Sequence, residues 1–503
     1  MCPNRRRARS RREAPSFSGP GRHAGRVERK RDKFAYWSRR GHGDPPDSAR
    51  TTPSTSGTAW RIAPGKQGVV KPFPSSFLWG AAVSAHAVEG GHFDSDWWRW
   101  EQRSGRIADG TTSQAGCDHR ARFREDIALA RKLGLNALLI SLEWSRIEPR
   151  EGDFSSEAMA HYAEVLRAMA GEGLEPVVAL QETTVPDWFA SSGGWLRSDA
   201  AKLFSRYAEQ AGAALGRLCR YWVPILTPVA TVRMGYLQGL WPPGRRSLLA
   251  GWKALQHMAH GHAAAYHAMR EHSPEAQIGA SVLGELVRPA DQTRPWDLRV
   301  ARWEQALSNE VWPAALISGR WPRPFGEERA LAGTVDFVGV SYYGSRRVRF
   351  RPGRGAYAQL VNGQGKRVPP HDCEPDAEGL AAVLHAAAGF GKPLMVLGNG
   401  LATDDDRARS HYLLDHVAAL HSVVDSGVEV LGYMHRSLLD GFEWDRGYRA
   451  RYGLVHVSGG TMARTPNTSA YLYRDIASAG EIRKGTLARY CPDWEPPGGL
   501  ELP

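Results

Sequence analysis

The stretch FLWGAAVSAHAVEG at residues 77–90 is the best starting point for predicting the fold. Its first part, residues 77–82, is a short apolar run of the length of a buried strand. The run continues into the polar residues His86 and Glu89, not into the G-x-G-x-x-G turn of a nucleotide-binding fold. We therefore expect an α/β protein with polar side chains just after its first strand.

Seven further apolar runs of strand length follow, at residues 137–142, 176–180, 221–226, 277–282, 336–340, 393–397 and 428–433. Helical patterns such as 126–135 and 156–173 lie between them, with glycine or proline often following the helix. Strands that alternate with helices pair in parallel through right-handed crossovers. Eight such units in roughly 430 residues predict a single (β/α)₈ barrel with long βα loops. A doubly wound open sheet is the alternative.

The charge is distributed unevenly along the 503-residue chain, whose formal net charge is +12. Residues 1–70 hold 17 Lys and Arg against 5 Asp and Glu, so the rest of the chain is balanced. We expect a disordered Arg-rich tail over 1–70, a barrel over 71–490 and a C-terminal tail over 491–503. No apolar segment follows the basic start, so no signal peptide is expected. Such tails can bind nucleic acid, but a solvated extension is the preferred interpretation.

Other features indicate a chain without a membrane span, metal or cofactor. No run of about 18 apolar residues is present. The five cysteines are scattered and odd in number, which favours a reducing compartment, and we predict a cytoplasmic protein. Four histidines between 257 and 267, and the run HDCE at 371–374, contain potential ligands. We assign both groups structural roles, because metal sites need convergent ligands.

The chain resembles glycoside hydrolase family 1, the β-glucosidase-like retaining glycosidases, over roughly residues 72–490. The resemblance is carried by residues 77–90 and by SDWWRWE (95–101), LEWSRIEP (142–149), SYY (341–343), NGLATDDDRAR (399–409) and SLLDGFEW (437–444). It implies a (β/α)₈ barrel with its site at the C-terminal ends of the strands.

Both catalytic positions implied by the resemblance depart from the family pattern. Thr227 stands at the acid/base glutamate of a T-N-E-P-like segment after the fourth strand, and Gly398 at the nucleophile of a T-E-N-G-like segment after the seventh. Leu139 stands at a family arginine and Arg436 at a family tryptophan. A threonine hydroxyl does not release a proton near neutral pH, and glycine supplies no nucleophile. We therefore predict a β-glucosidase-like protein that cannot perform normal retaining hydrolysis.

The remaining polar side chains predict a changed pocket for a small-molecule ligand such as a glycoside. Its predicted ligand-binding residues are His86, Glu182, Tyr343, Arg436, Glu443 and Trp444. The alternative is an active β-glycosidase, or another barrel enzyme, that uses relocated carboxylates at Glu182 and Glu443, with Glu285 as a weaker candidate. Two structural interpretations also remain open: Glu182 could form a salt bridge with Arg436, and His86 could be a hydrogen-bonded core histidine.

Overall fold

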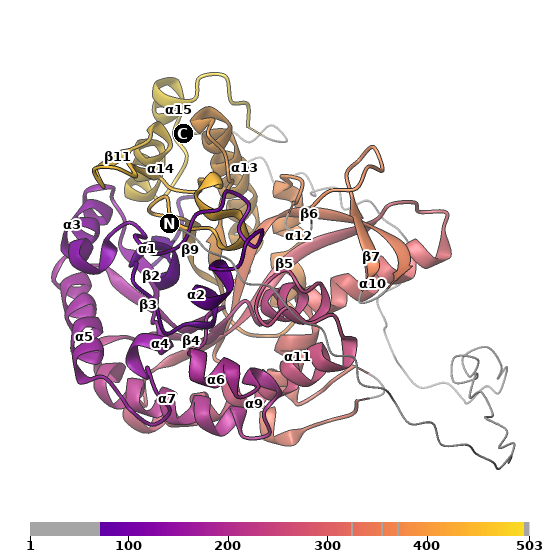
Figure 1. Cartoon of the computed structure of the whole chain (residues 1–503). Coiled ribbons are helices and arrows are strands. Elements are labelled where there is room, and N and C mark those ends of the chain that lie inside the picture. The colour runs from indigo at the N-terminus through magenta and orange to yellow at the C-terminus, as the bar shows by residue number, and fades with distance from the viewer. Residues whose placement is uncertain (1–70, 323–324, 354–355, 370–371, 497–501, 503) are drawn as a thin grey trace, which may run out of the picture. The chain divides into compact units, whose positions relative to one another are not determined.

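The computed structural model describes residues 71–322, 325–353, 356–369, 372–496 and 502 (Figure 1). The predicted Arg-rich tail, residues 1–70, lies outside the described residues. Within the described part, no helix combines the length and apolar character that a membrane crossing needs. The four cysteines described there, Cys117, Cys219, Cys373 and Cys491, are all free thiols.

Eight parallel strands close into a barrel, as predicted from the alternation of strands and helices. They are β1 (Leu78–Val83), β2 (Ala137–Ser141), β3 (Glu175–Glu182), β4 (Tyr221–Leu226), β5 (Gln277–Pro289), β6 (Phe337–Gly353), β8 (Leu394–Asn399) and β9 (Val430–Arg436). The order runs β5-β4-β3-β2-β1-β9-β8-β6, and pairing of β5 with β6 closes the ring. This closure excludes the alternative of a doubly wound open sheet.

Helices cover the outside of the barrel, for example α3, α5 and α7 outside the first strands (Figure 1). The long ones are α3 (His119–Lys132), α5 (Ser156–Gly171), α7 (Ala200–Leu215), α9 (Leu248–His272), α10 (Pro295–Asn309), α11 (Val311–Ser318), α12 (Ala377–Ala388), α13 (Asp406–Asp425), α14 (Thr468–Ala479) and α15 (Lys484–Tyr490). Short helices in the loops are α1 (Ala85–Val88), α2 (Asp96–Glu101), α4 (Trp144–Ile147), α6 (Asp187–Ser191) and α8 (Pro228–Thr231). Side-chain caps fix several starts: Ser155 accepts from the Ala158 N–H of α5, and Asp376 from the Gly379 N–H of α12.

Three strands and two strand extensions were not predicted from the sequence. β5 and β6 continue together beyond the barrel, and β7 (Ala356–Val361) pairs antiparallel with the end of β6, beside α10 (Figure 1). Two short strands, β10 (Val455–Val457) and β11 (Arg464–Pro466), form a separate antiparallel pair. The end of β6 reads SRRVRFRPG. The buried strands were predicted from apolar runs, and the arginines of this segment leave no such run.

The barrel interior is apolar and closely packed. Its cluster consists of Ala82, Ala137, Leu139, Val177, Ala179, Tyr221, Val223, Leu226, Phe337, Met395, Leu397 and Met434. Gly339 makes room for Leu397, because a Cβ at that glycine would lie 2.1 Å from the leucine Cδ1. Burial of each large apolar side chain contributes about 1.5–3 kcal/mol. The strands are thus held rigidly, and their C-terminal ends can fix the positions of polar side chains.

Candidate functional site

The side chains predicted to form the site all lie at or just beyond the C-terminal ends of strands. His86 is in α1 after β1, Glu182 ends β3, Thr227 follows β4, Tyr343 is in β6, Gly398 is in β8, Arg436 ends β9, and Glu443 and Trp444 lie in the loop after β9. The parallel register of the barrel brings these ends to one face. The fold therefore gathers the predicted residues on a single side of the barrel.

Arg436 joins the two acids of this face. Its Nη2 lies 2.5 Å from Glu443 Oε2, and its Nη1 lies 3.9 Å from Glu182 Oε1. Glu443 is buried, with 6% of its side chain exposed, and Arg436 and Glu182 are slightly more accessible, at 11% and 9%. Burial raises the pKa of Glu443, while the Arg436 charge acts in the opposite direction. The ion pair between Glu182 and Arg436 considered from the sequence is present, but Glu443 is the closer partner.

Tyr343 completes this charged group. Burial raises the pKa of Tyr343 to about 12, although the Arg436 charge lowers it. The phenol is therefore protonated at neutral pH and can donate a hydrogen bond. Its hydroxyl also lies over Gly398, where an added Cβ would be 2.9 Å away. Much of the space that a side chain at position 398 would need is thus used by Tyr343.

Below the charged residues, the floor of this face is apolar. Leu139 and Leu226 both belong to the barrel-interior cluster and are buried. Thr227 follows directly, and its backbone N–H donates to Ser281 Oγ at 3.1 Å. Asn399 donates from Nδ2 to the Tyr342 carbonyl oxygen at 2.7 Å. This face thus combines charged side chains with aliphatic groups of the barrel interior, and Leu226 lies beside Glu182 in the register of β3 and β4.

His86 and Trp444 form the aromatic side of the site. Their rings stack with centroids 5.6 Å apart and planes 2° from parallel. Trp444 also packs against Trp97 and Trp241, in a cluster of aromatic side chains. His86 is 1% exposed, and neither of its ring nitrogens has a hydrogen-bond partner among the described residues. The interpretation of His86 as a hydrogen-bonded core histidine is therefore wrong.

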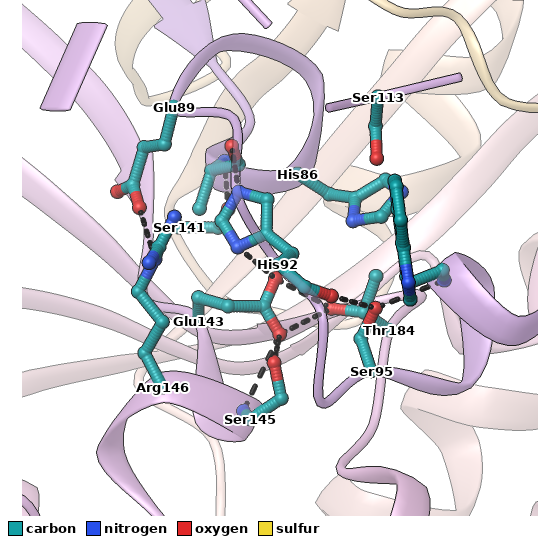
Figure 2. Close-up of polar contacts among 12 residues, drawn as sticks. His86, Glu89, His92, Ser95, Ser113, Ser141, Glu143, Ser145, Arg146 and Thr184 are labelled. Carbon is teal, nitrogen blue, oxygen red and sulfur yellow. Dashed lines mark hydrogen bonds and ion pairs between the residues drawn. The ribbon is translucent and has the colours of Figure 1, made fainter. Parts of the chain in front are cut away.

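Sequence reasoning missed the surroundings of His86. The ring of His92 lies 5.2 Å from the His86 ring, and Glu101 Oε2 lies 3.8 Å from His86 Nε2. Glu143, at the end of β2, lies 3.7 Å from His92 (Figure 2). His92 lies two residues after the stretch 77–90, and Glu101 belongs to the segment SDWWRWE at residues 95–101. Only the fold brings these two segments next to the end of β2.

Glu285, the weaker candidate for a relocated carboxylate, is fully engaged elsewhere. Arg233 Nη1 lies 2.9 Å and Arg346 Nη1 2.6 Å from its carboxylate, and Ser308 Oγ donates to it at 2.6 Å. Burial favours the neutral acid, but Arg233 and Arg346 outweigh it and hold the pKa of Glu285 below its usual range. Its contacts are those of a structural ion-pair network.

The two groups of potential ligands noted in the sequence do not converge among the described residues. On α9, His257 contacts the Trp195 carbonyl, His260 contacts Glu328, and His262 contacts the Thr334 carbonyl. Each of these three histidines thus has a different partner. In the run 371–374, residue 371 lies outside the described residues.

A cavity of 440 Å³ lies apart from the predicted site, near the N-terminal ends of α12 and α13. Its lining includes Asp376, Arg407, His411 and His416. None of the six predicted ligand-binding residues lines it. The cavity therefore adds no support to the predicted pocket at the strand ends.

Comparisons with known proteins agree with the resemblance seen in the sequence. The β-glucosidase A of Acetivibrio thermocellus is 27% identical over 438 residues, which cover 80% of this chain and 98% of that protein. Among solved structures, a β-glycosidase from Pyrococcus horikoshii is 31% identical with a TM-score of 0.76, covering 83% of this chain and 98% of that one. The β-glucosidase from Thermotoga maritima in complex with glucoimidazole is 27% identical with a TM-score of 0.75, covering 82% and 100%. Residues 69–482 match the model of glycosyl hydrolase family 1, and the chain belongs to this family.

Proposed function

We propose that this protein binds a glycoside, or a similar polar small molecule, at the C-terminal face of its barrel without performing retaining hydrolysis. Retaining hydrolysis needs two carboxyl groups about 5–5.5 Å apart, one as nucleophile and one as acid and base. The resemblance places these groups at residues 398 and 227. In this chain those positions are Gly398 and Thr227, and neither offers a carboxylate.

The observation that carries the proposal is the shared guanidinium of Arg436. Glu443 is bonded to it at 2.5 Å and Glu182 faces it at 3.9 Å. Burial raises the pKa of Glu443, and the Arg436 charge opposes that shift. The guanidinium holds both carboxylates in place by ion pairs, and neither acid stands at position 227 or 398. We therefore assign Glu182 and Glu443 to ligand binding.

The same residues offer a plausible binding surface for a polyhydroxylated ring. Glu182 and Glu443 accept hydrogen bonds, and Arg436 and the protonated Tyr343 donate them. Hydrogen bonds to ionised groups are the stronger ones, about 1.5–3 kcal/mol each. The aromatic cluster around Trp444 adds flat apolar surface beside them. Donors, acceptors and an aromatic wall together favour a sugar-like ligand.

The test measures turnover and binding on the same preparations. Purified protein is incubated with an aryl β-glucoside, and binding of deoxynojirimycin and methyl β-glucoside is followed by calorimetry. We expect no enzyme-dependent release of the phenol, and saturable binding that weakens at least about tenfold in Glu182→Gln and Glu443→Gln. Glu164→Gln is the matched control, because Glu164 is exposed on α5 and pairs with Arg124.

Three outcomes would overturn the proposal. Turnover that is lost in Glu182→Gln or Glu443→Gln would show that relocated carboxylates are catalytic. Absence of binding for both probes in wild-type protein would contradict a sugar-like ligand. A covalent glycosyl adduct found by mass spectrometry after reaction with an activated fluoroglycoside would also contradict it, and would identify the nucleophile.

A further inference from the structure

We propose that His86, His92 and Glu143 form a binding site for one divalent transition-metal cation of the zinc class. Each residue offers one ligand atom, and the three atoms lie within 4.8 Å of one another. His86 and His92 come from the chain just after β1, and Glu143 follows β2. Figure 2 shows both imidazole rings next to the Glu143 carboxylate.

The first support is the hydrogen bonding of His92. Its Nε2 lies 2.9 Å from the Ala85 carbonyl oxygen, which can only accept, so Nε2 carries the proton. Nδ1 of the neutral ring then presents a lone pair, and it lies 3.7 Å from Glu143 Oε2, which is also an acceptor. Two acceptors that face each other need a hydrogen-bond donor or a cation between them. A metal-bound histidine commonly donates its other N–H to a backbone carbonyl in this way.

The second support is the orientation of the Glu143 carboxylate. Ser145 Oγ donates to Oε1 at 2.7 Å, and Thr184 Oγ1 lies 3.1 Å from Oε2 (Figure 2). These neutral donors fix the carboxylate without compensating its charge. The side chain is 1% exposed, so solvent does not compensate it either.

A comparison with the other buried glutamates strengthens the argument. Among the described residues, the buried glutamates that have an arginine within ion-pair distance are Glu89, Glu148, Glu285, Glu304 and Glu443. Glu101 and Glu143 accept hydrogen bonds from neutral donors, and the only basic side chains that the described residues place within ion-pair distance of them are His86 at 3.8 Å and His92 at 3.7 Å. Both distances exceed those of a hydrogen bond. These two acids are therefore the ones whose charge a bound cation would offset.

The distance between His92 and Glu143 and the donor set of the three residues fit a zinc-class ion. Two ligand atoms about 2.1 Å from a tetrahedral ion lie about 3.4 Å apart. The 3.7 Å between His92 Nδ1 and Glu143 Oε2 is only a few tenths of an ångström longer. Two imidazoles and one carboxylate suit Zn²⁺, Co²⁺ or Fe²⁺ better than Mg²⁺ or Ca²⁺, which prefer oxygen ligands. Three protein ligands also leave one coordination position for water.

The test uses full-length protein without a polyhistidine tag. The protein is stripped with a chelator, loaded with Zn²⁺, desalted and analysed for bound metal. We expect about one equivalent of zinc, reduced at least about tenfold in affinity by His92→Ala and by Glu143→Gln. The matched control is His411→Ala, because His411, Cys491 and Asp493 form the other group of possible ligands among the described residues. That variant should keep the bound zinc.

X-ray absorption spectroscopy of zinc-loaded wild-type protein keeps the test valid if a variant fails to fold. The proposed site gives only nitrogen and oxygen ligands near 2.0–2.1 Å, whereas a site with Cys491 adds a sulfur near 2.3 Å. A nitrogen and oxygen shell with two imidazoles supports the proposal. A sulfur ligand, loss of zinc in His411→Ala alone, or no retained zinc in wild-type protein would overturn it. If only water or a proton lies between His92 and Glu143, the wild-type protein will retain no zinc.

Discussion

Replacement of Arg436 by methionine tests whether its charge stabilises the acids of the site. Methionine keeps most of the side-chain volume but leaves Glu443 and Glu182 without their cation. Removing one partner of a buried ion pair costs about 3–5 kcal/mol. This cost cannot exceed the free energy of protonating the carboxylate, because a carboxylate without a cation can take up a proton instead. For a carboxyl with an unfolded pKa of about 4.5, neutralisation at about pH 7.5 costs roughly 4 kcal/mol.

The same reasoning gives the pH dependence. The pKa of Glu443 is raised by burial even with Arg436 present, and loss of Arg436 raises it further. A folded acid with a raised pKa keeps its proton where the unfolded chain has released it, so stability falls as pH rises above about 4.5. We therefore expect Arg436→Met to be destabilised by about 3–4 kcal/mol at about pH 7.5 and by less than about 1 kcal/mol at about pH 5.

The assay is thermal unfolding followed by tryptophan fluorescence at the two pH values. An unfolding entropy of about 2.1 cal/mol/K per residue over roughly 420 residues converts the loss at about pH 7.5 into a fall in Tm of about 4 °C. Adding Glu443→Gln should restore part of that loss and weaken the pH dependence. Arg124→Met, which breaks the exposed pair with Glu164, should change stability by less than about 1 kcal/mol. A penalty of equal size at both pH values would refute the electrostatic explanation.

Three further predictions concern other parts of the fold. Gly400→Ala should destabilise the protein by several kcal/mol in chemical denaturation, because its Cβ would lie 1.9 Å from the Arg436 carbonyl oxygen. Gly459→Ala, with no atom within 4 Å of the added Cβ, should change stability by less than about 0.5 kcal/mol. Arg233 and Arg346 outweigh burial and lower the pKa of Glu285. The ionised Glu285 therefore stabilises the fold above its unfolded pKa of about 4.5, and this stabilisation is lost as pH falls below that value. Glu285→Gln should lower Tm at neutral pH, and the difference in Tm from wild type should shrink near pH 3.

The barrel was predictable because its strands are buried on both faces. Each of the eight runs, such as 137–142 and 393–397, is mainly apolar and is separated from the next by a helical pattern. The extension of β6 and its partner β7 were missed for the opposite reason. Residues 347, 349 and 351 of β6 are arginines, and a strand with one polar face gives no continuous apolar run.

The site was predictable only at the strand ends. Arg436 and Glu182 each end a strand, so their meeting on one face followed from the barrel. Glu443 was placed near them by the family resemblance, but its close bond to Arg436 depends on the path of the loop between residues 436 and 443. The grouping of His92 with Glu143 joins two loops and leaves no spacing pattern in the sequence.

The replacements at positions 139 and 436 have a common electrostatic explanation. The family pattern places an arginine at residue 139, beneath the nucleophile position, and a tryptophan at residue 436. With Gly398 at the nucleophile position, an arginine at 139 would be a buried charge without a partner there, which costs several kcal/mol. Leu139 avoids that cost by joining the barrel-interior cluster. Arg436 carries a positive charge at the ends of the strands instead, where Glu443 and Glu182 compensate it. Under the proposed function, this cation holds the two acids that would bind the ligand, and no cation is needed beside position 398.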